Sequence, residues 1–120
     1  MQYLLLIYEP EFDYSQLPPE DVALEMKSWT SYTEWLKGKG WFVGGEALQP
    51  VSSATTVRER DGKTSTTDGP FAETKEQLGG FYLVDCANLD EAIEAASRIP
   101  SVSRGSIEVR PLMTFDEAPS

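Results

Sequence analysis

Two stretches with helical periodicity alternate with four short apolar runs typical of β-strands in this chain of 120 residues. The strand-like runs cover residues 3–8, 43–48, 81–86 and 106–112. The helical stretches begin near Pro18 and near Asn88. The pattern therefore predicts the element order β-α-β-β-α-β, interrupted once by a hairpin.

The first helix has clear start and stop signals. Pro18 and Pro19, followed by Glu20 and Asp21, suit the first turn and its positive end. Gly38 and Gly40 favour a helix exit. Apolar or small residues recur at helical spacing and predict an inward-facing stripe. This stripe comprises Val22, Met26, Trp29, Thr33 and Leu36.

The second helix has a start resembling a capping box, with Asn88 followed three residues later by Glu91. Its predicted apolar face runs down to Pro100. That face comprises Leu89, Ala92, Ile93, Ala96 and Ile99.

Glycines mark the turns. Asp61-Gly62 lies between two β-prone runs within residues 55–67 and predicts a hairpin, because a tight turn needs positive φ at both central residues. Gly44-Gly45 predicts a bulge or a close backbone approach. Gly79-Gly80 precedes a strand rather than a helix, so it predicts a sharp entry into that strand and not a phosphate-binding loop.

Apart from the hairpin, this order predicts an α+β fold of the ferredoxin-like arrangement, an antiparallel sheet with both helices on one face. If Ile107 and Val109 point toward the helices, Glu108, Arg110 and Leu112 point away. The uncovered face predicts a homodimer with its sheets packed face to face.

Length predicts a single domain over residues 1–115, with a frayed tail over residues 116–120. The chain has 20 acidic and 10 basic residues, a net charge of −10, which argues against nucleic acid and membrane partners. The N-terminal apolar run is too short for a signal peptide or a membrane span, so we expect a cytoplasmic protein. The single cysteine, Cys86, is expected to be a buried apolar residue. With no histidine, the chain lacks the usual zinc ligands, and we expect neither metal nor cofactor.

Four segments resemble the DGPF branch of the YCII-related (YciI-like) family: DGPFAETKEQLGGFYLVD from residue 68, GGEALQP from 44, RDGK from 60 and IEVRPLM from 107. The resemblance implies a bacterial dimeric α/β barrel of ferredoxin-like protomers, often encoded beside extracytoplasmic-function sigma factors. It implies little about chemistry, although a dehydrochlorinase of hydroxylated aromatic rings belongs to the wider family.

YciI-type members carry a His and Asp pair in their cleft, and the first-helix histidine would fall near Trp29. This chain has no histidine, so that pair cannot be transferred. Proton chemistry would need a carboxylate with a raised pKa or a lysine with a lowered one.

Asp68 and Glu46 are the candidate catalytic carboxylates, and we expect Asp68 and Lys75 to reach the open sheet face near Glu46. Asp68 and Lys75 each have a structural alternative. Asp68 can cap its own turn, and Lys75 can pair on the surface with a neighbouring glutamate. Glu46, on a short bulged strand, has no obvious local partner.

Further candidates for ligand binding have structural alternatives. Phe71 is either a lid or a residue that pins its loop to the core. Tyr82 is either a cleft donor or a core residue. Arg58 and Arg110 either hold an anionic group or balance Glu46 and Glu108.

Two function classes remain. The first is a homodimer that binds a small molecule and performs acid/base chemistry of lyase or isomerase type. The second is a regulatory or interaction protein associated with a sigma factor, its acidic surface meeting a basic partner. A third interpretation, a purely structural dimer, has the cleft filled by side chains.

Overall fold

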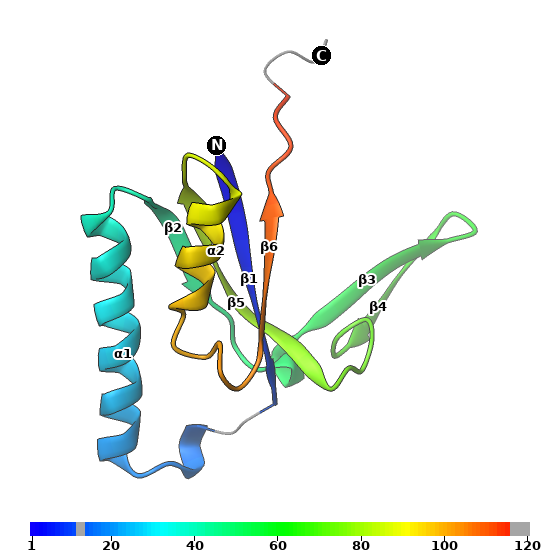
Figure 1. Ribbon diagram of the computed structural model, residues 1–120. Coiled ribbons are helices and arrows are strands. Elements are labelled where there is room, and N and C mark those ends of the chain that lie inside the picture. The colour runs from blue at the N-terminus through cyan, green and yellow to red at the C-terminus, as the bar shows by residue number, and fades with distance from the viewer. Residues whose placement is uncertain (12–13, 116–120) are drawn as a thin grey trace.

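The computed structural model describes residues 1–11 and 14–115, so the predicted frayed tail lies outside the described residues (Figure 1). The strands and helices follow the predicted order. They are β1 (Gln2–Pro10), α1 (Pro19–Gly38), β2 (Phe42–Ala47), β3 (Thr55–Arg60), β4 (Lys63–Asp68), β5 (Glu76–Asp85), α2 (Leu89–Ser97) and β6 (Ser106–Pro111). Two short 3-10 turns cover Tyr14–Gln16 and Val51–Ser53.

The main sheet has the strand order β2-β5-β1-β6, and each neighbouring pair is antiparallel. The two helices lie on one side of this sheet (Figure 1). The mixed α and β class predicted from the sequence is therefore confirmed. No helix in the described part of the chain is long and apolar enough to cross a membrane.

Alternate residues of the central strand form the core. Tyr3, Leu5 and Ile7 are buried on the side of the helices. Tyr32 and Leu36 of α1 join the same core. The buried Tyr32 hydroxyl donates a 2.7 Å hydrogen bond to the carbonyl oxygen of Ala95, so it satisfies one of the last carbonyls of α2.

The start of α1 is as predicted, with proline in the first turn, and Gly40 follows its end in a left-handed conformation at φ 75°. The prediction is wrong for Gly38, which is the last helical residue and has no positive φ. The apolar stripe of α1 divides, however. Leu36 is buried in the core, whereas Met26 is 65% exposed. The prediction that the whole stripe packs inward is therefore wrong at Met26.

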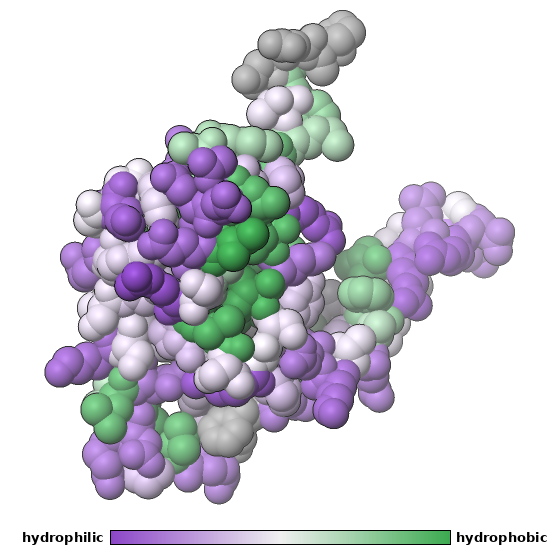
Figure 2. Space-filling view, in the orientation of Figure 1, coloured by the Kyte–Doolittle hydropathy of each residue, from purple (hydrophilic) through white to green (hydrophobic). Residues whose placement is uncertain are grey.

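The cap of α2 is confirmed, because the backbone N–H of Glu91 donates to the Asn88 side chain at 3.0 Å. The predicted apolar face is wrong at Leu89 and Ile93, which are 50% and 49% exposed. The buried positions of α2 are Ala92, Ala95 and Ala96. Small alanine side chains allow the helix to approach the sheet closely, and the larger residues remain outside. Figure 2 shows hydrophobic side chains gathered over α2 and β6.

The opposite sheet face is covered by neither helix. Ile107 and Val109 pack against the core, as expected, and their neighbours Glu108 and Arg110 are exposed. In the register of the sheet, Glu108 and Arg110 lie opposite Leu6 and Leu4. This second face therefore combines aliphatic and charged side chains.

The hairpin of β3 and β4 forms a separate two-stranded sheet that projects from the main sheet (Figure 1). Its turn has positive φ at Asp61 (54°) and Gly62 (76°), which confirms the predicted turn. Most of its side chains are exposed and hydrophilic (Figure 2).

Both remaining glycine pairs lie inside strands. The register shift between Phe42 and Gly44 is the bulge predicted for β2. The sharp entry predicted at Gly79-Gly80 is wrong, because β5 already begins at Glu76. A Cβ atom at Gly80 would lie 2.9 Å from the carbonyl oxygen of Glu46, so the close approach of β2 requires glycine there.

Candidate functional site

The DGPF segment closes the base of the hairpin. Gly69, at φ 103°, donates its backbone N–H to the carbonyl oxygen of Ala54 at 2.7 Å. The Thr56 hydroxyl donates to the Gly69 carbonyl at 2.8 Å. The Arg58 guanidinium donates to the carbonyl oxygen of Phe71 at 3.1 Å. These hydrogen bonds attach the backbone of the segment to strand β3 and the residue before it, which is a structural role.

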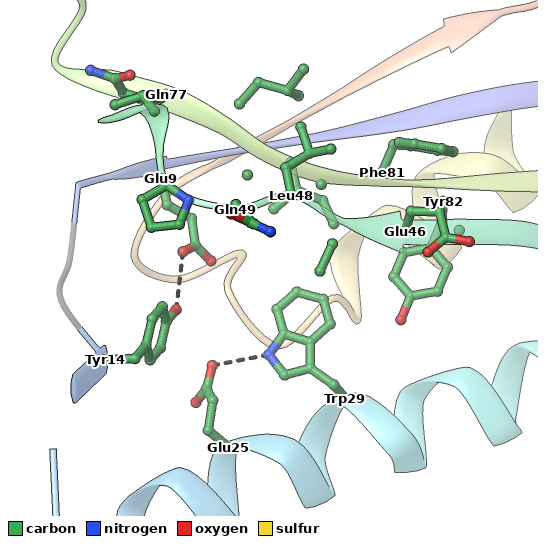
Figure 3. A pocket seen from close by; sticks show the side chains of 18 of the residues that line it. Glu9, Tyr14, Glu25, Trp29, Glu46, Leu48, Gln49, Gln77, Phe81 and Tyr82 are labelled. Atoms are coloured by element: carbon green, nitrogen blue, oxygen red, sulfur yellow. Dashed lines mark hydrogen bonds between the residues drawn. The ribbon is translucent and has the colours of Figure 1, made fainter. Parts of the chain in front are cut away.

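A pocket of about 590 Å³ lies between residues 22–33 of α1 and the strands β1, β2 and β5 (Figure 3). Ile7 and Tyr82 line it, so it is on the side of the sheet that bears the helices. The sequence analysis had instead predicted a cleft on the opposite, open face of the sheet.

The pocket lining contains two of the predicted site residues, Glu46 and Tyr82. Glu46 lies opposite Phe81 on the edge strand β2, and its side chain is exposed at the rim. The other predicted residues are exposed and lie outside the pocket lining. They are Asp68, Lys75, Arg58, Arg110 and Phe71.

Phe71 is 77% exposed, so the interpretation in which it pins its loop to the core is wrong. Arg110 donates to the Glu108 carboxylate at 3.0 Å, the balancing contact that the sequence offered as an alternative. Cys86 is buried as predicted, and burial raises the pKa of its thiol. A protonated thiol is a poor nucleophile.

Aromatic side chains form one wall of the pocket. Trp29 and Tyr82 are stacked, with 6.4 Å between ring centroids and 7° between planes. The Thr33 hydroxyl donates to the carbonyl oxygen of Trp29 at 3.0 Å and lies 2.8 Å from the Tyr82 hydroxyl. Because Thr33 has one hydroxyl proton, the Tyr82 hydroxyl is the donor in their contact. Phe42 meets Tyr82 edge to face.

A polar cluster of Glu9, Tyr14, Glu25 and Arg104 lies at the other end of the pocket. The Tyr14 hydroxyl donates to Glu9 Oε2 at 3.3 Å, and the Trp29 indole N–H donates to Glu25 Oε1 at 3.0 Å (Figure 3). Arg104 donates to Glu25 Oε1 and lies 3.7 Å from Glu9 Oε1. The Glu9 and Glu25 side chains are only 17% and 25% exposed. One guanidinium therefore joins two partly buried carboxylates from β1 and α1.

The electrostatics of the cluster fix its protonation. Burial and the charge of Glu9 raise the pKa of the Tyr14 hydroxyl, although Arg104 acts in the opposite direction. Burial lowers the pKa of Arg104, but its hydrogen bond to Glu25 and the charges of Glu25 and Glu9 outweigh burial and raise it. At neutral pH Tyr14 is thus a hydrogen-bond donor and Arg104 is charged.

The sequence did not identify Glu9, Glu25 or Arg104 as site residues. One local signal was available, since Glu25 and Trp29 are four residues apart on one helix and can meet. Glu9 and Arg104 are 95 positions apart, and only the fold brings them together. Among the described residues, no three histidine, cysteine or acidic side chains are grouped so that they could hold a metal ion.

Comparisons with known proteins agree with the sequence resemblance. An uncharacterized protein of Rhizobium meliloti (strain 1021), R00369, is 40% identical over 117 residues, which cover 96% of this chain and 94% of that protein. The family model of the YCII-related domain matches residues 1–116. The chain therefore belongs to the YCII-related domain family.

Proposed function

We propose that this protein binds a small molecule in the pocket between α1 and the sheet. The observation that carries the proposal is the combination of a cavity of about 590 Å³, an aromatic wall and a few fixed polar groups. Ligand sites in proteins commonly have this volume and this composition. Apolar surface supplies affinity at such a site, and the polar groups orient the ligand.

Acid/base chemistry of lyase or isomerase type would use carboxylates here, because the chain has no histidine. Glu46 at the pocket rim is our candidate for proton transfer, and Asp68 stays a second candidate. Their roles are separable. We expect Glu46→Gln to weaken ligand binding and Asp68→Asn to leave it unchanged if the DGPF segment only closes the hairpin. Dependence on Asp68 would instead indicate a site completed by a second subunit.

We further propose a ferredoxin-like protomer of the DGPF branch that forms a homodimer through its open sheet face. The strand order β2-β5-β1-β6 with antiparallel neighbours supports the protomer assignment. Leu4, Leu6 and Leu83 on the open face support the interface, because such a face is stabilised when a second copy covers it. Analytical ultracentrifugation of the wild type and of Leu6→Arg tests this, with a dimer expected only for the wild type.

Binding is tested best by a pair of matched variants. Val22 lines the pocket on α1, and Val57 is an exposed residue of the hairpin. We expect Val22→Trp to fill part of the cavity and to abolish binding of small aromatic fragments, whereas Val57→Trp leaves binding intact. The readout is the ¹⁵N-NMR signal of the Trp29 indole N–H, assigned with Trp29→Phe.

A fragment that shifts the Trp29 signal equally in both variants would contradict the pocket as the binding site. Folding of Val22→Trp is checked independently by its thermal unfolding, since a folded variant that no longer binds is the informative result.

A second candidate is a regulatory protein that associates with a sigma factor. The net charge of −10 and the projecting hairpin, with Val57 and Phe71 both exposed, support it. Co-purification with an extracytoplasmic-function sigma factor, lost when the hairpin is shortened across residues 57–66 and retained in Val22→Trp, would favour this candidate over the first.

A further inference from the structure

The charged residues that line the pocket are all acidic. They are Glu9, Glu11, Glu25 and Glu46, and no lysine or arginine lines it among the described residues. Arg104 is not part of the lining, but it contacts Glu25 and Glu9 and compensates one charge of this pair. The cavity therefore carries uncompensated negative charge, which attracts cations and repels carboxylates and phosphates.

The carboxylate of Glu25 is positioned rather than mobile. Trp29 and Arg104 both donate hydrogen bonds to its Oε1 atom. Neither of these two bonds uses the other carboxylate oxygen, Oε2. Figure 3 shows the Glu25 carboxylate beside Tyr14 and the Trp29 indole, at the end of the pocket opposite Tyr82. A bound ammonium group can thus meet a fixed carboxylate oxygen, with little loss of side-chain entropy on binding.

The wall of the cavity favours the same class of ligand. Trp29 and Tyr82 present aromatic surface, which attracts flat apolar groups and, at the ring faces, cations. Phe42 adds apolar surface, since Lys37 already lies over its ring at 5.4 Å from the centroid. The cavity is large enough for a ring system with a short side chain.

We infer that the ligand is a small organic cation, an aromatic or similarly flat apolar body that carries an amine. This inference rests on the proposed function, since it names the chemical class that the same pocket takes. The apolar body lies against the wall of Trp29 and Tyr82, and the ammonium group lies toward Glu25 and Glu9.

Three probes that share one ring system test the class: tryptamine (cationic at pH 7), tryptophol (neutral) and indole-3-acetate (anionic). Dissociation constants come from titrations of the Trp29 indole signal at low ionic strength. We expect tryptamine to bind about five- to tenfold more tightly than tryptophol, and indole-3-acetate to bind most weakly. The advantage of tryptamine should shrink as salt is added.

Charge-neutral variants locate the preference. We expect Glu25→Gln to bring the affinity for tryptamine close to that for tryptophol, and Glu46→Gln to reduce the gap by a smaller factor. Glu59→Gln, an identical change on the exposed hairpin, should leave both affinities unchanged. If Glu25→Gln fails to fold, Glu46→Gln with the salt series keeps the comparison available.

The possible failures are distinguishable. Equal affinities for tryptamine and tryptophol would overturn the cationic class and leave the proposed pocket standing. Tighter binding of indole-3-acetate would overturn it in the same way. Absence of any Trp29 shift with all three probes would overturn the proposed function and this inference together.

Discussion

The two halves of α1 have one sequence pattern and two different environments. In the C-terminal half, Tyr32 and Leu36 are buried against β1 and α2. From the N-terminal half to the middle of the helix, Val22, Met26 and Trp29 line the pocket, and Trp29 also packs against the edge of the core. Both halves follow the same helical periodicity, so amphipathicity alone does not distinguish a residue of the core from a residue of a binding wall.

The difference follows from the lengths of the elements. The 20 residues of α1 rise about 30 Å, whereas the nine residues of α2 rise about 14 Å. The N-terminal half of α1 extends beyond α2 (Figure 1). With no second helix beside it, this half leaves space above the sheet, and that space is the pocket.

The largest expected effect is in the buried half. Leu36 is fully buried, so we expect Leu36→Ala to lower the free energy of unfolding by about 2–5 kcal/mol through lost burial and the cavity left behind. Urea denaturation monitored by circular dichroism measures it. A cost no greater than that of a pocket substitution would remove the distinction between the two halves.

Tyr32→Phe should lower the free energy of unfolding by about 1–2 kcal/mol, because the Ala95 carbonyl loses its buried hydrogen-bond donor.

Burial raises the pKa of the Tyr32 hydroxyl above its ordinary value of 10.0. The unfolded chain therefore loses this proton first, and stability is complete below about pH 10 and falls above it. Unfolding measured between pH 8 and 12 should show a shallower alkaline decline in Tyr32→Phe than in the wild type, and identical declines would contradict burial as the cause.

Arg104 joins the pocket half of α1 to β1 through Glu25 and Glu9. Its side chain is 42% exposed, so solvent screening limits the cost of Arg104→Gln to about 1 kcal/mol or less. We expect this cost in the free energy of unfolding to be smaller in high salt. We also expect Arg104→Gln to shift the NMR signal of the Trp29 indole N–H. Arg60→Gln on the exposed hairpin is the control, and an equal effect there would rule out a specific link.

The smallest effect is expected at Met26, which is mostly exposed at the pocket. Met26→Ala should change the free energy of unfolding by less than about 0.5 kcal/mol. The same substitution should alter fragment affinity at the Trp29 signal. A stability loss comparable to that of Leu36→Ala would show that Met26 belongs to the core after all.

Much of the fold was predictable because its signals are local. The turn at Asp61-Gly62, the cap at Asn88 and the helix exit at Gly40 each depend on the conformation of a few consecutive residues. The burial of Leu89 and Ile93 was predicted wrongly, since the face that α2 presents depends on how closely its alanines let it approach the sheet.

The site was less predictable. Glu46 and Tyr82 were identified from the sequence and do line the pocket. The pairing of Arg104 with Glu9 and Glu25 was missed, because an ion pair between distant segments leaves no pattern in a single sequence. The DGPF segment drew attention by its composition, whereas its contacts are with the backbone of the hairpin.

The amino-acid sequence by itself determined the order of strands and helices, the turns between them and the family, since these depend on residues that are neighbours in the chain. The tertiary structure alone decided that part of the amphipathic helix α1 lines a cavity. It also decided that Arg104 forms ion pairs with both Glu9 and Glu25 at one end of that cavity. The physical reason is that burial and charge pairing depend on distances in space, which the relative lengths and packing of the elements set.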